Sequence, residues 1–360
     1  MTGDERRRAG LAAIVICALI GAGAGYFAYA AHRDDRTSSG SPDQSAPGGS
    51  IAPIDSSSPV LDDPRLVFVD ATPGPTYGRV AVVPATDPSG PRAASDVQCL
   101  RVYAAGDHLL CLRTTGNLVG QYVAVLLDDH LQEIKTIPVA GLPSRARISA
   151  DGRIASWTVF VSGDSYSGGN FSTRTSILDI GTGELVGSLE DFAITLDGKP
   201  YDNVDVNYWG VTVADDDNTF YATLKTGRST YLVKGDIRER TVTTLRTNVE
   251  CPSLSPDGTR IAFKKRVSGD DGRNPWRLYV LDLATMHETA LAETRSVDDQ
   301  AAWLDNERIA YALPREGISS YDTWFVAADG TGSPQVLIEH ATSPAAVGVA
   351  STDGEVGAKP

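Results

Sequence analysis

Short runs of alternating apolar and polar residues, separated by Gly, Asp, Asn or Pro, recur along the chain from about residue 65. A period of two predicts β-strands with one buried face. The clearest unit is residues 254–263, Leu-Ser-Pro-Asp-Gly-Thr-Arg-Ile-Ala-Phe, which joins two strands through an Asp-Gly turn. Residues 148–156 repeat it closely, and looser copies lie at 213–221 and 303–311. The pattern therefore predicts a series of similar β-hairpins.

Each of these hairpins is followed by a second one, which makes four-stranded antiparallel units of about 40–50 residues. A repeat of this length built from four short strands is typical of a β-propeller blade. Five complete blades are expected, and they begin near residues Val97, Arg145, Val204, Glu250 and Asp299. The sequence therefore predicts an all-β fold, a six-bladed β-propeller with its sixth blade assembled from both ends of the chain.

This closing blade is expected to combine one C-terminal strand with about three N-terminal strands. Residues 346–354 resemble the first strand and turn of another blade, and the strands at 66–70 and 79–83 belong to no other blade. Joining them closes the ring and removes exposed strand edges.

The N-terminus predicts a location. Residues 1–8 include Arg6, Arg7 and Arg8, and residues 9–31 form an apolar run. At about 1.5 Å per residue this run is long enough to cross a bilayer. Basic residues before it place residues 1–8 in the cytoplasm and the remainder outside. The expected location is the cell membrane, with a single-pass helix and an extracytoplasmic C-terminal domain. The alternative is a signal peptide cleaved near Ala30, which releases a secreted protein.

Residues 32–64 are rich in Ser, Pro, Gly and Asp, and they are expected to form a disordered, flexible linker. The propeller is then assigned to residues 65–354, followed by a short tail at 355–360.

Charge and cysteines limit the partners. With 32 Lys and Arg and 46 Asp and Glu the net charge is −14, which argues against nucleic acid as a partner. Cys99 and Cys111 flank the turn at 105–107 and are expected to face each other across a hairpin, where an oxidising compartment favours a disulfide. Cys251 is expected to be a buried free thiol.

The motif at 254–263, with its copy at 148–156, resembles the repeat of TolB-like six-bladed propellers, an Asp-Gly turn repeat related to WD-type repeats. The resemblance covers about residues 66–353. It implies an extracytoplasmic scaffold that docks other envelope proteins through its faces and central funnel. The α/β domain that precedes the propeller in TolB is not expected here. Propellers of prolyl-oligopeptidase-type peptidases carry the same repeat, so it indicates a fold more than an activity.

The sequence offers no catalytic, metal or cofactor site. A Gly-x-Ser-x-Gly elbow is not found, and residues 163–169 are interpreted as a polar Gly/Ser loop. The histidines are scattered, without metal-ligand spacing. Asp215, Asp216 and Asp217 occupy a hairpin turn, where turn chemistry explains them and calcium binding stays open.

Binding is expected in two long loops, at 162–173 and 190–208. Recognition often resides in loops that carry aromatic residues on a rigid scaffold. The tryptophans at 276, 303 and 324 are expected in the core between blades. The candidate binding residues in the second loop are Phe192, Tyr201, Asp202, Asp205, Tyr208 and Trp209.

The functional prediction is a membrane-tethered, non-enzymatic scaffold that binds an envelope or secreted protein. A small-molecule or glycan binding module that uses the central funnel is the alternative, and a hydrolase or lyase is a third reading. A binding module predicts an apolar or aromatic funnel, whereas an enzyme predicts convergent titratable groups with perturbed pKa values.

Overall fold

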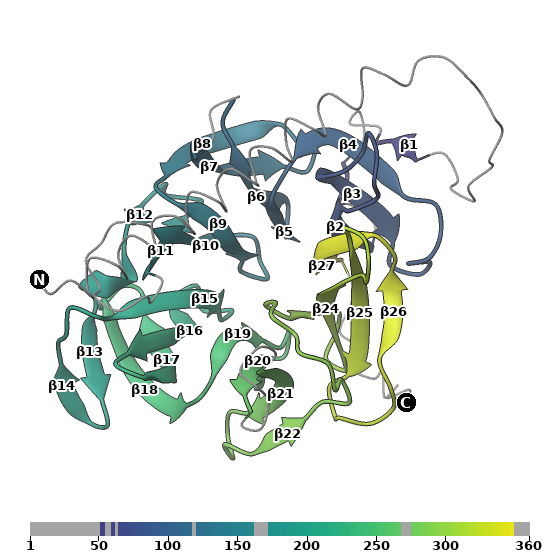
Figure 1. The fold of residues 1–360 in the computed structure, drawn as a ribbon. Coiled ribbons are helices and arrows are strands. Elements are labelled where there is room, and N and C mark those ends of the chain that lie inside the picture. Colours follow the sequence, from purple (N-terminus) through teal and green to yellow (C-terminus); the bar gives the residue numbers. More distant parts are fainter. Residues whose placement is uncertain are drawn as a thin grey trace, which may run out of the picture. The chain divides into compact units, whose positions relative to one another are not determined.

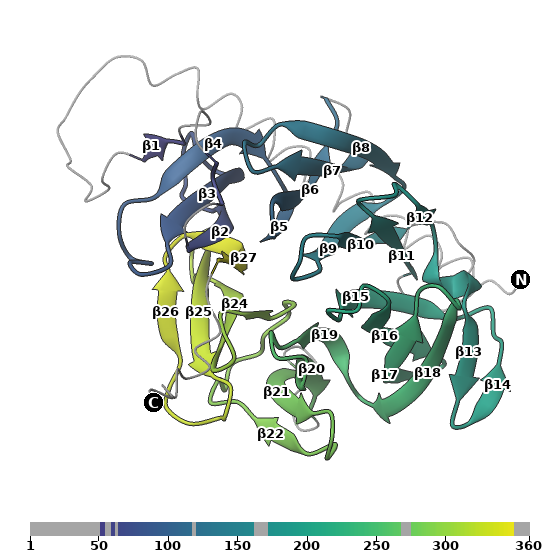
Figure 2. The ribbon, with the colours of Figure 1, turned by 180° about the vertical axis from the view of Figure 1, so that it is seen from behind.

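The computed structural model describes residues 51–54, 59–61, 64–116, 120–161, 172–267 and 275–348. The chain divides into two units, residues 1–49 and 50–360, and all described residues belong to the second. They form 27 β-strands and one 3-10 helix, arranged as six sheets around a ring (Figures 1 and 2). The predicted all-β six-bladed propeller is confirmed.

Blades 1 to 5 follow one another along the chain, and the first strands of blades 1 to 4 lie nearest the centre of the ring (Figure 1). The strands of blades 1 and 2 are β5 (Arg101–Ala105), β6 (His108–Thr114), β7 (Tyr122–Asp128), β8 (Glu133–Val139), β9 (Leu142–Ile148), β10 (Ile154–Val161), β11 (Ser172–Asp179) and β12 (Leu185–Val186). Those of blades 3 to 5 are β15 (Asn207–Val213), β16 (Thr219–Thr226), β17 (Ser229–Asp236), β18 (Thr241–Thr247), β19 (Glu250–Leu254), β20 (Arg260–Arg266), β21 (Trp276–Asp282), β22 (Glu288–Ala290), β23 (Ala302–Trp303), β24 (Arg308–Pro314), β25 (Tyr321–Ala327) and β26 (Gln335–Ile338).

The closing blade joins both ends of the chain, in the order β27, β2, β3, β4 and β1. Its strands are β27 (Ala341–Val347), β2 (Arg65–Asp70), β3 (Arg79–Pro84), β4 (Ala93–Gln98) and β1 (Ala52–Pro53). β27 lies earlier in the chain than the strand predicted at 346–354. Ser343 has a φ of 55° and, with Pro344, forms a bulge opposite Phe68, so a strand passes through a proline that looked like a break.

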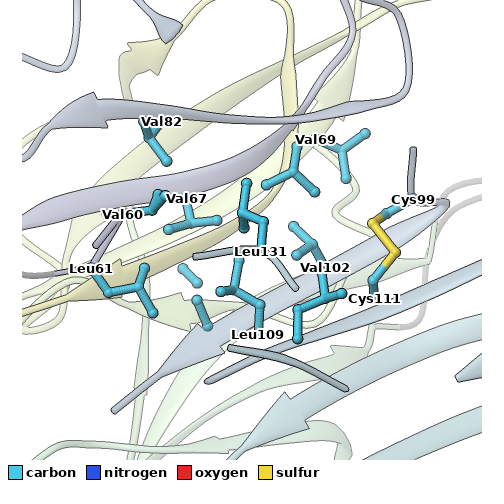
Figure 3. Close-up of a cluster of buried hydrophobic side chains, with 14 of the residues drawn as sticks. Val60, Leu61, Val67, Val69, Val82, Cys99, Val102, Leu109, Cys111 and Leu131 are labelled. Atoms are coloured by element: carbon cyan, nitrogen blue, oxygen red, sulfur yellow. A yellow bond between two sulfur atoms is a disulfide. The ribbon is translucent and has the colours of Figure 1, made fainter. Parts of the chain in front are cut away.

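The C-terminal part of the linker predicted at 32–64 packs onto the propeller. β1 pairs in parallel with β4, and the backbone N–H of Val60 donates to the carbonyl of Asp129 over 2.7 Å. Val60 and Leu61 are buried beside Val67, Val102 and Leu109 (Figure 3). The prediction of a flexible linker is therefore wrong for residues 51–54 and 59–61, because β1 pairs with β4 and because Ile54, Val60 and Leu61 pack into a cluster between the closing blade and blade 1.

The segment at 190–208 is not a loop. A 3-10 helix, η1 (Leu189–Asp191), is followed by the hairpin of β13 (Ala193–Leu196) and β14 (Lys199–Tyr201). β13 pairs in parallel with β18, so this hairpin extends blade 3 to six strands at its outer edge (Figure 1). Most of the other predicted loop, residues 162–171, lies outside the described residues.

The recurring motif forms the turn between the first and second strands of a blade. Ser255 donates from its hydroxyl to a carboxylate oxygen of Asp257 and accepts from the backbone N–H of Arg260 over 3.0 Å. Gly258 has a φ of 69°, which its missing Cβ permits. Asp217 occupies the equivalent position in blade 3 with a φ of 52°, while Asp216 accepts from the N–H of Thr219. Turn chemistry thus accounts for the acidic run at 215–217.

Asp257 predicts a pH dependence of stability. Hydrogen bonds from Ser255, Thr259 and Arg260 overcome the effect of burial and lower the pKa of Asp257 to about 2. A depressed carboxyl pKa contributes stability that is present above pH 4 and is lost as the pH falls toward 2. Asp257→Asn is therefore expected to cost about 2 kcal/mol of unfolding free energy at pH 7 and much less near pH 2. Urea unfolding of both proteins across this range checks it, and a pH-independent difference would contradict it.

Cys99 and Cys111 form a disulfide (Figure 3). The predicted disulfide is confirmed, but the two cysteines do not face each other across a hairpin. Cys99 lies between β4 and β5, and Val102 is the residue opposite Cys111 in the hairpin. The bond therefore ties β6 to the joint between the closing blade and blade 1.

Within the described residues no helix is long and apolar enough to cross a membrane, and the candidate span at 9–31 lies outside them.

Candidate functional site

A cavity of about 1400 Å³ opens among the inner strands of the ring, and we call it the central cavity. Its wall includes the starts of β9, β15 and β19 and the ends of β16 and β20. Neighbouring strands are antiparallel, so these strand ends all lie on one face of the propeller. The Asp-Gly turns lie at the other ends of the same strands. The motif that reveals the fold is therefore on the face opposite the cavity.

The central cavity is strongly basic. Its described lining carries six cationic and two acidic side chains, a net charge of +4, in a chain of net charge −14. No histidine is among the described lining residues. The charged residues are Arg101, Arg145, Lys225, Arg228, Lys264, Arg266, Glu250 and Asp298. The lining also includes Phe160, Trp209 and Trp276, so the cavity combines the aromatic residues expected of a binding module with many more charged groups than expected.

Lys264 of blade 4 and Arg145 of blade 2 approach one carboxylate in the cavity. The ammonium of Lys264 donates to Oδ1 of Asp298, and Nη2 of Arg145 lies 3.8 Å from the same oxygen. The Lys264 side chain is 4% exposed and that of Arg145 12%, whereas Asp298 is 70% exposed. Two cations in the wall therefore hold one accessible carboxylate.

Arg101 adds a third cation near these two. Burial lowers the pKa of the Arg101 guanidinium; Asp299 raises it, and Arg145 lowers it further. The two guanidinium groups therefore repel each other. At Arg145 the effect of burial is outweighed by Cys251 and Asp299, which raise its pKa, so the uncompensated cation is Arg101. An anionic ligand would relieve both the burial cost and the repulsion.

Arg147 closes the cavity toward the opposite face. Its guanidinium lies 4.3 Å from the ring centroid of Tyr103 in blade 1, and Nη2 donates to the carbonyls of Gln300 and Ala301 over 3.2 and 2.5 Å. Blade 2 and blade 5 are opposite in a ring of six, so these bonds cross its axis. Arg147 does not line the cavity, which is consistent with a floor at this level.

Glu250 is the second acidic group of the wall. Its side chain is buried, and burial raises its pKa against the opposing effect of Lys264 and Arg266. Cys251 follows it as a buried free thiol, with Nε of Arg145 donating to its sulfur over 3.4 Å. A Cβ on Gly210 would lie 2.7 Å from the Cys251 Cα, so only glycine permits this approach of β15 and β19.

One aromatic residue of the wall, Trp276, is partly covered by cations. Lys264 Nζ and Arg266 Cζ each lie 4.6 Å from the ring centroid of Trp276. Trp276, expected in the core, is a half-buried residue of the central cavity. Trp303 is buried as expected, and Trp324 is half-buried and packs against the core cluster of blades 4 and 5.

A second cavity of about 860 Å³ lies beside the first, between blades 4 and 5, and Val267 lines both. Two of the three cations in its described lining pair with carboxylates of the chain, and the third, Arg277, donates to the backbone carbonyl of Glu293 over 3.1 Å. Arg295 donates to both carboxylate oxygens of Glu293, over 2.9 and 2.6 Å, and Arg315 donates to Asp322 over 3.0 Å. The excess positive charge is therefore a property of the central cavity.

The candidate binding residues from the sequence do not form one surface. Phe192 and Tyr208 are buried in the core between blades 2 and 3. The Tyr201 hydroxyl hydrogen-bonds the Thr226 hydroxyl, which donates to Asp205 over 2.5 Å, and Asp202 is exposed. Trp209 lines the central cavity. The expected recognition loop is thus mainly a structural extension of blade 3.

Sequence reasoning missed the cationic wall. Arg101, Arg145 and Lys264 come from three blades, and only ring closure brings them together. A usable signal was present, because Arg145 and Glu250 stand at predicted blade starts, where an inner strand is expected to be apolar. Charged residues at the starts of inner strands point into the mouth of a propeller.

Asp128, Asp129 and His130 are the group of potential metal ligands found among the described residues. Asp128 accepts from the N–H groups of His130 and Gln132, and His130 Nδ1 lies 2.6 Å from Asp129. These bonds form the turn between β7 and β8, outside the central cavity.

No protein-family model matches the chain, and none of the curated proteins matches it. Solved structures do resemble it. TolB from Acinetobacter baumannii is similar with a TM-score of 0.55 and 19% identity, over 79% of this chain and 66% of that one. A chain of a nidogen/laminin complex has a TM-score of 0.50 and 10% identity, over 79% of this chain and 98% of that one.

These likenesses show the fold. The chain is a six-bladed propeller structurally similar to the TolB propeller, and it covers just under two thirds of that TolB chain. A puromycin-hydrolysing peptidase of Mycobacterium tuberculosis is less similar, with a TM-score of 0.46 and 14% identity over 77% of this chain and 43% of that one. A similarity at this level does not support a comparison of function. At these identities a shared architecture does not carry a shared function.

Proposed function

We propose that this propeller is a non-enzymatic binding module of the cell envelope that captures an acidic segment of a protein partner in the central cavity. The observation that carries the proposal is a cavity of net charge +4 in a chain of net charge −14. Complementary charge steers encounter and selects partners, and the acidic remainder of the surface repels the same ligand elsewhere.

The size and lining of the central cavity favour a peptide segment over a small metabolite or a sugar. Its volume of about 1400 Å³ exceeds the roughly 300–1,000 Å³ that is common for small-molecule sites. Sugar recognition commonly uses open aromatic faces, whereas two cations of the chain already lie against Trp276. Guanidinium and ammonium groups suit carboxylates.

The location is part of the proposal. The apolar run at 9–31 would act as a membrane anchor or signal segment, and the polar residues that follow would act as a tether. The Cys99–Cys111 disulfide supports an oxidising, extracytoplasmic compartment.

Site-specific photocrosslinking in cells tests the proposal. A photoreactive residue at position 228, exposed at the rim of the central cavity, is expected to yield one discrete envelope protein. The control position is Asp107, exposed in the turn between β5 and β6 on the opposite face, where no such product is expected. Mass spectrometry of the crosslinked peptide should place the contact in an acidic segment of the partner.

A product from position 107 alone, or a crosslinked segment without acidic residues, would contradict the proposed use of the cavity. Absence of any protein product at position 228, together with saturable binding of an acidic oligosaccharide, would replace the protein partner with a glycan.

A further inference from the structure

Asp298 lies in the central cavity as a carboxylate held by the chain itself. Lys264 donates to its Oδ1, and Arg145 lies 3.8 Å from that oxygen. The aspartate remains 70% exposed, whereas the side chains of Lys264 and Arg145 are only 4% and 12% exposed. The chain thus presents one carboxylate in the position where a ligand's carboxylate would meet the same cations.

Of the carboxylates that oppose the cations at this point, Asp298 is the exposed one, whereas Glu250 is buried. Arg101, Arg145 and Lys264 come from blades 1, 2 and 4 and line the cavity with Asp298. Lys264 and Arg145 lie within 4 Å of Asp298, and Arg101 acts on it electrostatically. Asp299 is also close, but it is buried and accepts from the backbone N–H of Ala312 over 3.1 Å. One accessible carboxylate therefore faces three cations.

We propose that Arg101, Arg145 and Lys264 form a carboxylate-binding subsite that Asp298 occupies in the free protein and from which an acidic side chain of the partner displaces it. The proposal rests on the function proposed above and names the first contact of the partner. It assigns the ligand group as a carboxylate because a carboxylate is the group that the subsite already binds.

Two further features agree with displacement. Burial alone would raise the pKa of Asp298, but Lys264 and Arg145 lower it, so the subsite stabilises the ionised form of a carboxyl group. Residues 292–301 belong to no strand, and Asp298 stands in this connection ahead of β23. A side-chain rotation there releases the cations without breaking a strand ladder.

Removal of the internal carboxylate tests the proposal. We expect Asp298→Asn to bind a fluorescein-labelled hexaglutamate peptide about five- to tenfold more tightly than the natural protein, because it loses a competitor and a repelling charge. Asp298→Glu, which keeps the carboxylate, should remain within about twofold. Asp107→Asn makes the same charge change on the opposite face and should leave the affinity unchanged. Hexaglutamine should bind none of them.

The thermal stability of the same proteins supplies a readout without ligand. Asp298→Asn leaves Lys264, with 4% of its side chain exposed, without this ion pair, so its melting temperature should fall. Hexaglutamate should raise the melting temperature of Asp298→Asn by more than it raises the melting temperature of the natural protein.

Unchanged or weaker hexaglutamate binding by Asp298→Asn would overturn the displacement proposal, whether or not the natural protein binds the peptide. If neither the natural protein nor Asp298→Asn binds hexaglutamate, the proposed function fails together with the displacement proposal. Tighter binding of a hexauronate than of hexaglutamate by both proteins would keep the subsite and change the partner from protein to acidic glycan.

Discussion

Arg101→Gln combined with Arg145→Gln is expected to weaken hexaglutamate binding about 100-fold. Each charge-assisted contact contributes about 1.5–3 kcal/mol when its partner is otherwise desolvated, and 1.4 kcal/mol corresponds to a factor of ten. The two residues provide two of the three cations around Asp298. Fluorescence anisotropy with the labelled peptide at low salt measures the effect, and the affinity of the natural protein should fall steeply as salt rises.

The matched control removes the same two charges elsewhere. Arg238 and Arg240 are exposed in the turn between β17 and β18, on the face opposite the central cavity. Arg238→Gln with Arg240→Gln should change the affinity for hexaglutamate less than about twofold, because the only effect expected is that of the lower net charge. Equal losses in the two double variants would show that the peptide responds to overall charge, and the cavity would lose its assigned role.

The distribution of charge explains how such a cavity can be selective. Six cations gathered in one cavity of an acidic chain create a local field opposite to that of the rest of the surface. A long polyanion that cannot enter the cavity meets repulsion outside it, whereas a short acidic segment meets only the cations. Specificity therefore comes from the acidic exterior as much as from the basic interior.

The fold was predictable because its information is local. The turn at 254–263 can be recognised from ten residues, and Ser255, Asp257 and Gly258 act within that turn. The predicted blade starts lie within a few residues of the observed ones because each blade repeats the same order of strands. Errors arose where pairing is non-local. The parallel pairing of β13 with β18 and the bulge at Ser343 have no signature in neighbouring residues.

The site was not predictable to the same extent because it is assembled across blades. Lys264 lies 119 positions after Arg145 in the sequence, and both approach the same carboxylate oxygen. Phe192 and Tyr208 looked like recognition residues because aromatic side chains are common both in cores and at interfaces. Sequence alone does not separate the two when a hairpin folds back onto the blade.

Truncation after residue 340 is expected to have the largest effect on stability. It removes β27, which covers β2 and contacts β5 of blade 1, so Leu66, Val67, Phe68 and Val69 would border an open sheet edge. It also removes the carbonyl of Ala341, to which the buried Thr323 hydroxyl donates over 3.0 Å. We expect the melting temperature to fall by about 10–20 °C or cooperative unfolding to be lost, since roughly 5 kcal/mol shifts a domain of this size that far.

Truncation after Gly348 is the control for this experiment, because it shortens the tail and leaves β27 complete. Its melting temperature should match that of the full chain. A synthetic peptide of residues 341–348 added to the shorter truncation should raise the melting temperature with increasing concentration, since a strand that pairs with β2 binds the folded state alone. If the shorter truncation melts like the full chain, β27 does not hold the ring closed. If the peptide fails to rescue a destabilised truncation, the loss arises from something other than pairing with β2.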